Sequence, residues 1–429
     1  MKKLRSKQKL IGGISIILVA IILAIAITTN IIKNNSQIAN EGYFSTTANA
    51  NSNLLASYIK SGITIGGITG TLESLNTFDA TALPEDILWG ETAYVKGEKI
   101  TGTRVDTVAQ AQESEVYFQD NKYLKDDLDN TVVVPKGFKI PKDSATKVED
   151  GIVIEDKKGN QFVWIPAKTG AGITIHTTLG DNTIVYKRTA YNVNYASGVI
   201  DSITNSEIIY YSTIDMNNSF TEAMHDDEKN SVDAYGGYYI GRFEMGDEES
   251  TKSKVMRTAI SGSSNTATVK KNQAPYNYIT YAEGKNLAEN MGNVYDYSAT
   301  TKLVSSYAWD TAISLIQLKN SDYGASSQEG NYINTTFTYY DLNGTQQTKA
   351  LNVPTLVPTG QTEAVCNIYD MGGNCQERTT EIINNSPQGS NDVVRGATYA
   401  DDYYHSSGIR GGTVLEAREN TSYRVTLFL

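Results

Sequence analysis

The stretch NIYDMGGNCQERTTE, residues 367–381, concentrates side chains that can do chemistry. It combines a Gly-Gly turn, the thiol of Cys375 and the carboxylate of Glu377. That density is typical of a functional site. It leaves two interpretations open: the working part of an enzyme, or the frame on which another surface is displayed.

Metal and nucleic-acid chemistry have little support elsewhere in the chain. The histidines, His176, His225 and His405, lie far apart and lack the spacing of a metal site, so we expect ordinary surface residues. The formal net charge is −11, and no run of Lys or Arg occurs outside the first ten residues, so nucleic acid is not expected as a partner. Two cysteines are too few for a disulfide-rich scaffold or a four-cysteine zinc site.

Length and composition indicate how many modules the chain can form and of what kind. A chain of 429 residues has room for roughly two to four modules. Its 40% of apolar residues is enough for a core. The 28 tyrosines, against 9 phenylalanines and 3 tryptophans, indicate either a β-rich exported protein or a binding surface.

The N-terminus predicts the compartment. Residues 10–32 carry no charge and are long enough to cross about 30 Å of hydrocarbon as a helix. Five cations precede this stretch and only Lys33 follows closely, so the positive-inside rule places the rest of the chain outside the cell. The motif Ala24-Ile25-Ala26 leaves cleavage as a signal peptide open. We therefore expect a single-pass cell-membrane protein, with residues 1–33 as a basic tail and transmembrane anchor.

Short modules are expected between this anchor and the main domain. Residues 34–57 are rich in Asn, Ser, Thr and Ala, which indicates a polar stalk. Residues 58–73 and 93–104 share an aromatic, an apolar residue, Lys and Gly, followed by Ile and a Thr-Gly-Thr turn. This predicts Gly-rich β-repeats within residues 58–130, ending in a partly helical linker at 105–129. The repeats resemble β-spacers of bacteriophage tail and bacterial surface proteins.

From residue 131 the pattern becomes that of an α+β domain. Short β-branched runs closed by Pro, Gly or Asp predict strands at 131–141, 150–156, 160–166 and 236–246. Apolar residues recur at helical spacing in 278–291 and 305–319, and Ser305 or Ser306 can cap the second helix. The apolar run at 422–429 is expected to lie within a sheet, because an unpaired strand of this kind is an aggregation hazard.

Several motifs occur in an order known from one family. They are FVWIP, GGYYIGRFE, PYNYITYAEGKNLA, SSYAWDTAISLI, NIYDMGGNCQERTTE, VVRGATY and SYRVTLF. In this order they resemble formylglycine-generating enzyme-like domains, also called sulfatase-modifying factor domains. The resemblance implies a C-type-lectin-like fold for residues 131–429.

Departures from the family argue against its chemistry. The copper-dependent enzymes carry two cysteines shortly after their R-G-G motif, where a thiolate serves as nucleophile and soft metal ligand. Here Asp401 and Ser406 occupy those places, so we do not expect an enzyme. Both tryptophans of the family's W-E-W motif are also replaced, by Gln376 and Arg378.

The resemblance has two further implications for the turn. In the family, acidic and amide oxygens near it can hold Ca²⁺, which would make Asn374 and Glu377 the ligands here. Otherwise Asn374 completes the turn and Glu377 pairs with a neighbour. Cys366 and Cys375 flank the Gly-Gly turn, and they either close a small disulfide loop outside the cell or remain reduced and buried.

The C-terminal part also resembles the variable proteins of diversity-generating retroelements, in which a lectin-like frame displays a mutable patch. Mutagenesis of template adenines spreads Asn codons to residues such as Tyr, Asp, His and Ser, but does not reach Lys, Glu, Gln, Met or Trp. Residues 399–415 contain none of those five types. The candidate ligand contacts, with rings as anchors and polar groups for orientation, are Tyr399, Asp401, Asp402, Tyr403, Tyr404, His405, Asn420, Ser422 and Tyr423.

Three functions compete at this point. The favoured one is a cell-surface adhesin or receptor-like protein whose C-terminal loops bind a protein or glycan on another cell or surface. The second is a formylglycine-generating-type oxidase, which requires the missing cysteines. The third is a structural prophage or surface component, which the spacer repeats favour. Arg395 and Arg424 are assigned to the frame, and Tyr399 has a core ring as its alternative role.

Overall fold

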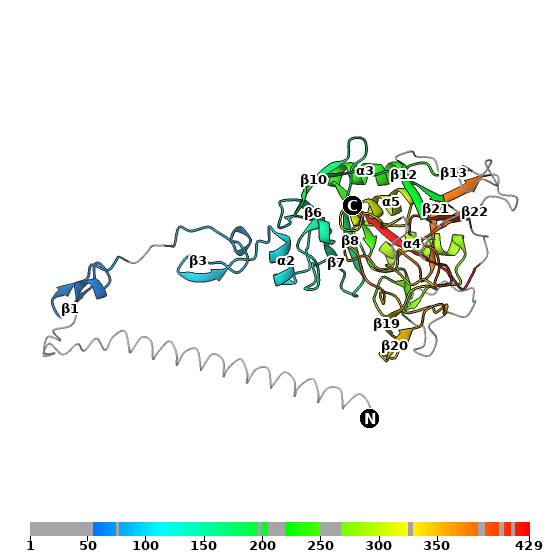
Figure 1. Cartoon of the computed structure of the whole chain (residues 1–429). Helices are drawn as coiled ribbons and strands as arrows, with labels where there is room; N and C mark the ends of the chain where they lie inside the picture. The colour runs from blue at the N-terminus through cyan, green and yellow to red at the C-terminus, as the bar shows by residue number, and fades with distance from the viewer. Residues whose placement is uncertain are drawn as a thin grey trace, which may run out of the picture. The chain divides into compact units, whose positions relative to one another are not determined.

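The structure is a computed structural model that describes residues 55–73, 77–194, 199–204, 219–248, 267–324, 329–384, 391–402, 407–412 and 417–429. The chain divides into two compact units. The first comprises residues 1–81 and 94–98, and the second comprises residues 82–93 and 99–429. Figure 1 shows the helices and strands of both units in chain order by colour.

The described elements make an α+β protein, as predicted. The helices are α2 Val108–Ser114, α3 Asp226–Tyr235, α4 Tyr281–Val294 and α5 Ser306–Ile316, with 3-10 turns η1 Ala56–Tyr58, η2 Pro84–Asp86 and η3 Val148–Asp150. The strands up to the middle of the chain are β1 Thr64–Ile65, β2 Ile68–Thr69, β3 Thr92–Val95, β4 Glu98–Thr101, β5 Lys122–Lys125, β6 Thr131–Val134, β7 Val153–Glu155, β8 Gln161–Pro166, β9 Ile173–Thr177, β10 Gly180–Ile184, β11 Ala190–Asn194, β12 Val199–Thr204 and β13 Ser219–Thr221. The remaining strands are β14 Gly237–Gly241, β15 Gly246–Asp247, β16 Ala267–Thr268, β17 Ala274–Pro275, β18 Thr300–Leu303, β19 Phe337–Tyr340, β20 Gln346–Lys349, β21 Gln376–Asn384, β22 Asn391–Arg395, β23 Arg410–Gly412, β24 Thr421–Tyr423 and β25 Val425–Phe428.

Residues 55–73 and 83–104 form two copies of one small module. In each copy a 3-10 turn precedes a two-stranded hairpin, β1–β2 or β3–β4. The same backbone bond closes both, from Thr71 N to Ala56 O and from Thr103 N to Pro84 O, each 2.8 Å long. The predicted repeat is therefore present.

The two Thr-Gly-Thr turns owe their glycine to a close approach of the backbone. A Cβ on Gly70 would lie 2.2 Å from the carbonyl oxygen of Ile59, and one on Gly102 would lie 2.1 Å from that of Leu88. The second copy starts before the predicted range 93–104. Asp86 N bonds Leu83 O as Tyr58 N bonds Leu55 O, so Asp86, and not Tyr94, is the equivalent of Tyr58. A local pattern of aromatic, Lys and Gly does not reveal this register, which long-range backbone bonds determine.

A five-stranded antiparallel sheet, in the order β18-β25-β14-β8-β7, lies at the centre of the second unit. The strands predicted at 150–156, 160–166 and 236–246 contribute β7, β8 and β14. Trp164 on β8 packs against Tyr239 on β14, with ring centroids 5.0 Å apart. The C-terminal strand β25 pairs with both β14 and β18, so its apolar side chains are covered as expected.

A second sheet, in the order β13-β21-β22-β23, has β24 paired in parallel with β21. Helix α5 contacts both β8 and β21, and it therefore links the two sheets. Ser305 caps α5, because its hydroxyl accepts a hydrogen bond of 3.2 Å from Ala308 N. Thr280 and Glu283 form a reciprocal capping box at the start of α4.

The predicted single-pass membrane localisation is contradicted. Within the part of the chain that the structure describes, no helix is long and apolar enough to cross a membrane. The longest of these helices, α4, has 14 residues, whereas a bilayer requires about 20 apolar residues. The stretch at 10–32 that carried the prediction lies outside the described residues, as does most of the predicted stalk at 34–57.

Candidate functional site

The loop at residues 396–409 joins β22 to β23 and contains several of the predicted contact residues. The last residue before it, Arg395, lies directly opposite the first residue after it, Arg410, in the antiparallel register. Both arginines are buried, with exposed fractions of 0% and 3%. Like charges opposite each other destabilise a strand pair, so the stem of this loop needs a counter-charge.

Asp310 of helix α5 supplies that counter-charge to both arginines. Its Oδ1 accepts a hydrogen bond of 2.5 Å from Arg395, and its Oδ2 accepts one of 2.5 Å from Arg410. The carboxylate is fully buried, and Thr189 N donates a further bond of 2.9 Å to it. The two ends of the loop are thus clamped to one carboxylate on the helix that links the sheets.

Glu381 of β21 extends this clamp. It accepts hydrogen bonds from Arg410 at 2.7 Å, from Arg188 at 2.8 Å and from Ser306 Oγ at 2.5 Å. Its arginine partners outweigh the effect of burial and hold the pKa of Glu381 below its usual range. A buried ion pair is tolerated only when its partners are hydrogen-bonded, and each carboxylate oxygen of Asp310 and Glu381 accepts at least one hydrogen bond.

Backbone bonds fix the first part of the loop to its neighbours. Tyr399 N donates to Asn374 O and Asp401 O accepts from Ile333 N, both at 2.8 Å. The carboxylate of Asp401 accepts bonds of 2.8 Å from the backbone and the hydroxyl of Thr398, which closes a local turn. Beyond the tip, Trp309 Nε1 donates to Ser407 O at 2.8 Å. The loop is therefore held from both sides.

The structure brings together only some of the predicted contact residues. Asp401, Asp402 and Asn420 are half-buried. Tyr403, Tyr404 and His405 lie outside the described residues, as does Ser406, which the family alignment placed at a cysteine position.

Three of the predicted contacts belong to the interior. Tyr399 is 9% exposed and packs with Leu356 and Cys375, which is its alternative role as a core ring. Ser422 and Tyr423 are fully buried, so their assignment as ligand contacts is wrong. They lie on β24, whose parallel pairing with β21 carries them into the sheet, and the ring of Tyr423 meets that of Tyr276 edge-on at 5.8 Å.

Asn374 and Glu377, the pair implied for Ca²⁺, have their oxygens engaged by protein groups. Arg424 donates two bonds to Glu377, of 2.6 and 2.8 Å. The amide oxygen of Asn374 accepts from Asn331 at 2.9 Å and from Val357 N at 3.1 Å. The described residues contain no group of three or more His, Cys, Asp or Glu that could hold a metal ion. This geometry does not fit a Ca²⁺ site.

Three buried carboxyl groups, those of Glu244, Asp370 and Glu377, nevertheless surround Arg424. Burial raises the pKa of Glu377 to about 7, although Arg424 acts in the opposite direction. Burial raises the pKa of Asp370 to about 6. Burial and repulsion from Asp370 and Glu377 raise the pKa of Glu244 well above its usual range. One guanidinium cannot neutralise three carboxylates, so the cluster disfavours the ionised form of Glu244.

Of the two states that the sequence left open for Cys366 and Cys375, the structure has the reduced one, because both are free and buried. Cys366 packs in the main core and its thiol donates to Glu149 O at 3.2 Å, whereas Cys375 packs beside Tyr399 in a separate cluster. Burial raises the pKa of Cys366 to about 12 and that of Cys375 well above its usual range. Neither thiol is therefore activated as a nucleophile.

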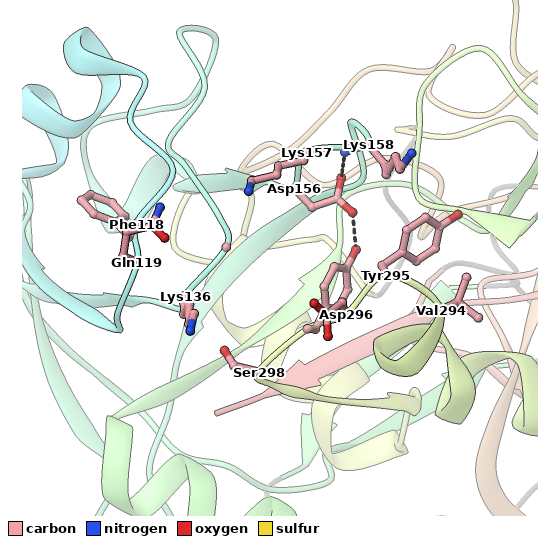
Figure 2. Close-up of a pocket in the computed structure, with 12 residues that line it drawn as sticks. Phe118, Gln119, Lys136, Asp156, Lys157, Lys158, Val294, Tyr295, Asp296 and Ser298 are labelled. Carbon is pink, nitrogen blue, oxygen red and sulfur yellow. Dashed lines mark hydrogen bonds between the residues drawn. The ribbon is translucent and has the colours of Figure 1, made fainter. Parts of the chain in front are cut away.

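A second candidate site, which the sequence did not indicate, is an open cavity of about 540 Å³. Four short segments of the second unit line it: 118–119, 136–137, the β7–β8 turn at 156–158, and the end of α4 with the following residues to 298. Figure 2 shows Lys136, Lys157 and Lys158 around it, with Tyr295 and Asp296 from the α4 side. A repeated sequence pattern could have indicated this site. Asp-x-x-x-Asn occurs at 126–130 and again at 156–160, and the second copy carries two of the lining lysines.

Comparisons with known proteins are limited to distant structures. No protein-family model matches the chain, and no curated protein matches it. PvdO from Pseudomonas aeruginosa aligns with 65% of this chain and 98% of its own length, at 14% identity and a TM-score of 0.36. Treponema denticola variable protein 1 aligns with 63% of this chain and 96% of its own length, at 12% identity and a TM-score of 0.32.

A protein titled CarF aligns with 45% of this chain and 87% of its own length, at 12% identity and a TM-score of 0.30. These neighbours include a variable protein, the kind of protein that the C-terminal motifs resemble, but their TM-scores are below 0.5 and they carry no argument about this chain. The roles assigned to individual residues rest on the contacts within this chain.

Proposed function

We propose that this chain is a non-catalytic binding protein that presents the loop at 396–409 from a C-type-lectin-like frame. The observation that carries the proposal is the clamp of Arg395 and Arg410 on Asp310. A binding loop gains affinity when its ends are held before the ligand arrives, because less ordering remains to be done on binding. The ligand is a protein or a glycan.

The chemistry of the loop supports binding over catalysis. Asp401 and Asp402 are half-buried carboxylates of this loop, and they suit the orientation of a ligand's donors. The thiols that an oxidase of the resembling family would use are absent from the loop, and Cys366 and Cys375 are buried elsewhere. The residue types at 399–415 are those that adenine mutagenesis of Asn codons reaches, so we include retroelement diversification of this loop in the proposal.

The test is a binding screen of the full chain against glycan and protein arrays. The double variant Asp401→Ala with Tyr403→Ala removes loop groups, and Asp120→Ala removes an exposed carboxylate outside the loop. Binding that disappears only in the double variant supports the proposal. Equal binding by all three proteins contradicts it, as does oxidation of a cysteine-containing peptide by the chain after addition of copper.

Diversification has its own test in the genome that encodes the chain. We expect a reverse transcriptase gene and a template repeat whose adenines align with the variable codons of 399–415. A genomic neighbourhood that lacks both the reverse transcriptase gene and the template repeat contradicts diversification. The binding proposal is tested separately by the glycan and protein arrays.

A further inference from the structure

The cavity beside the β7–β8 turn is separate from the loop at 396–409 and shares no lining residue with it. Its volume of about 540 Å³ falls within the range of small-molecule sites, about 300–1,000 Å³. A single inorganic anion would leave most of this space unfilled. The lining therefore suits a ligand of several linked groups.

The turn that carries two of the lysines is rigidly built. Asp156 Oδ1 accepts bonds of 2.8 Å from the backbone N–H groups of Lys158 and Asn160. Its Oδ2 accepts 2.8 Å from Asn160 Nδ2 and 2.6 Å from the hydroxyl of Tyr297. Figure 2 shows these bonds to the Lys158 backbone and the tyrosine hydroxyl from Asp156, at the centre of the lining. The backbone of the turn is thus positioned before any ligand binds.

The cations of the cavity differ from their neighbours in having no acidic partner among the described residues. Lys139 makes ion pairs with Glu115 at 3.2 Å and with Glu155 at 3.3 Å. Lys136, Lys157 and Lys158 are exposed, and none of them has an ion pair with a carboxylate in the described parts of the chain. In a chain of net charge −11, three unpaired cations at one cavity are the feature to explain.

The arrangement of these cations indicates an extended ligand. In Figure 2 the ammonium groups of Lys157 and Lys158 extend to opposite sides of Asp156, and Lys136 lies apart from both. Lys157 Nζ also lies 5.9 Å from the ring centroid of Tyr117. Ammonium groups spread around a cavity in this way suit a chain with several spaced acidic groups.

The remaining lining suits the ring and hydroxyl groups of sugars. Tyr295 and Tyr297 stack with centroids 5.9 Å apart and an interplanar angle of 23°, and Tyr295 is half-buried. Its flat ring offers a surface for the C–H face of a sugar. Gln119, Asp296 and Ser298 are exposed polar groups that can exchange hydrogen bonds with hydroxyls.

We propose that this cavity binds an acidic oligosaccharide, with its carboxylates on Lys136, Lys157 and Lys158 and one sugar ring against Tyr295. The proposal is independent of the function assigned to the loop at 396–409. It requires affinity that falls with salt, because exposed charges are screened within about 10 Å at 0.1 M ionic strength.

The test is isothermal titration of the full chain with tetragalacturonate, with neutral maltotetraose and inorganic phosphate as comparison ligands. We expect tetragalacturonate to bind, and both comparison ligands to bind at least tenfold more weakly. The variant Lys157→Gln with Lys158→Gln should weaken tetragalacturonate binding at least tenfold. The matched control Lys60→Gln removes one exposed lysine of the first repeat and should bind like the parent chain.

Tyr295 separates a sugar site from a plain anion site. Tyr295→Ala should weaken tetragalacturonate binding severalfold and leave phosphate binding unchanged, whereas Tyr295→Phe keeps the ring and should retain affinity. Thermal melts of every variant establish that it is folded. Three results would overturn the proposal: no tetragalacturonate binding to the parent chain, equal binding by the double lysine variant, or phosphate binding as tight as that of tetragalacturonate.

Discussion

The stem of the loop at 396–409 and the cavity beside the β7–β8 turn use the same charged residue types in opposite ways. At the stem, Arg395 and Arg410 are buried and share the carboxylate of Asp310. At the cavity, Lys157 and Lys158 are exposed and lack an ion pair with any described acid. The first arrangement stabilises the chain's own conformation, and the second leaves charge available to another molecule.

The difference separates residues that stabilise the fold from residues that are available to a ligand. A buried charge loses its hydration and must find its partners inside the fold, so its removal acts on stability. An exposed charge in a cavity contributes little to folding, so its removal acts on binding. Each prediction below tests that separation, beginning with the largest effect.

Asp310→Ala should be the most damaging substitution. It leaves the guanidinium groups of Arg395 and Arg410 buried without their shared carboxylate, and breaking one buried pair in this way costs about 3–5 kcal/mol. Urea denaturation followed by circular dichroism measures the loss. Asp120→Ala, which removes an exposed carboxylate, should change the free energy of unfolding by no more than about 0.5 kcal/mol. Similar values for the two variants would contradict the clamp.

Glu222 gives the stem a pH dependence. Burial and repulsion from Glu381 raise the pKa of Glu222 to about 8, whereas an unfolded glutamate titrates near about 4.3. The unfolded state therefore loses this proton first, and the associated stability falls as pH rises from about 4.5 to about 8, by at most about 1.4 kcal/mol per pH unit. Ser306 N and Thr380 donate hydrogen bonds to this side chain.

The variant Glu222→Gln isolates the contribution of that proton. It cannot ionise, so its free energy of unfolding should lack this component, and its advantage over the parent chain should grow between pH 5 and pH 8. Denaturation curves at fixed pH values measure the difference. A difference that is constant with pH would show that Glu222 is ionised in the folded protein.

Asp401 is intermediate between the buried charges of the stem and the exposed charges of the cavity. It is half-buried and accepts two bonds from Thr398, so Asp401→Ala should lower the free energy of unfolding by about 1 kcal/mol. Asp401→Asn keeps an acceptor oxygen and should lose less. Urea midpoints rank the variants. If the two substitutions cost the same, the turn at 398–401 does not depend on this acceptor.

The double variant Lys157→Gln with Lys158→Gln should have the smallest effect on folding, within about 0.5 kcal/mol of the parent chain. Lys158 contributes its backbone N–H to the turn, and a glutamine keeps that group. Differential scanning calorimetry measures the change. A loss of several kcal/mol would show that these lysines stabilise the fold, and it would remove the contrast with the stem.

Much of the fold could be predicted because its signals are local. Ser305 marks the start of α5, the apolar run closed by Pro at 160–166 marks β8, and the C-terminal run marks β25. The positions of Ser422 and Tyr423 could not be predicted, because they depend on the parallel pairing of β24 with β21, some 45 residues away. A local pattern of Asn, Ser and Tyr resembles a surface turn whether or not the segment pairs with a distant strand.

The two candidate sites differ in how far the sequence predicts them. Arg395 was assigned to the frame from its family position, but its counterpart Arg410 and the shared acid Asp310 come from segments whose contact depends on the folded chain. The cavity had a readable signal. Asp126 with Asn130 and Asp156 with Asn160 form the same side-chain-bonded turn, and the second displays Lys157 and Lys158 at its tip.

The paired modules at 55–73 and 83–104 have a consequence for how such a chain can change in length. Their hairpin strands have two residues in the first copy and four in the second, while the close glycine approaches at the base are the same. Side chains alternate between the faces of a strand with a period of two, so growth by two residues per strand preserves which residues face inward. The module can therefore accept insertions at its tip in steps of four residues, two per strand, whereas an insertion of one residue per strand would exchange its faces.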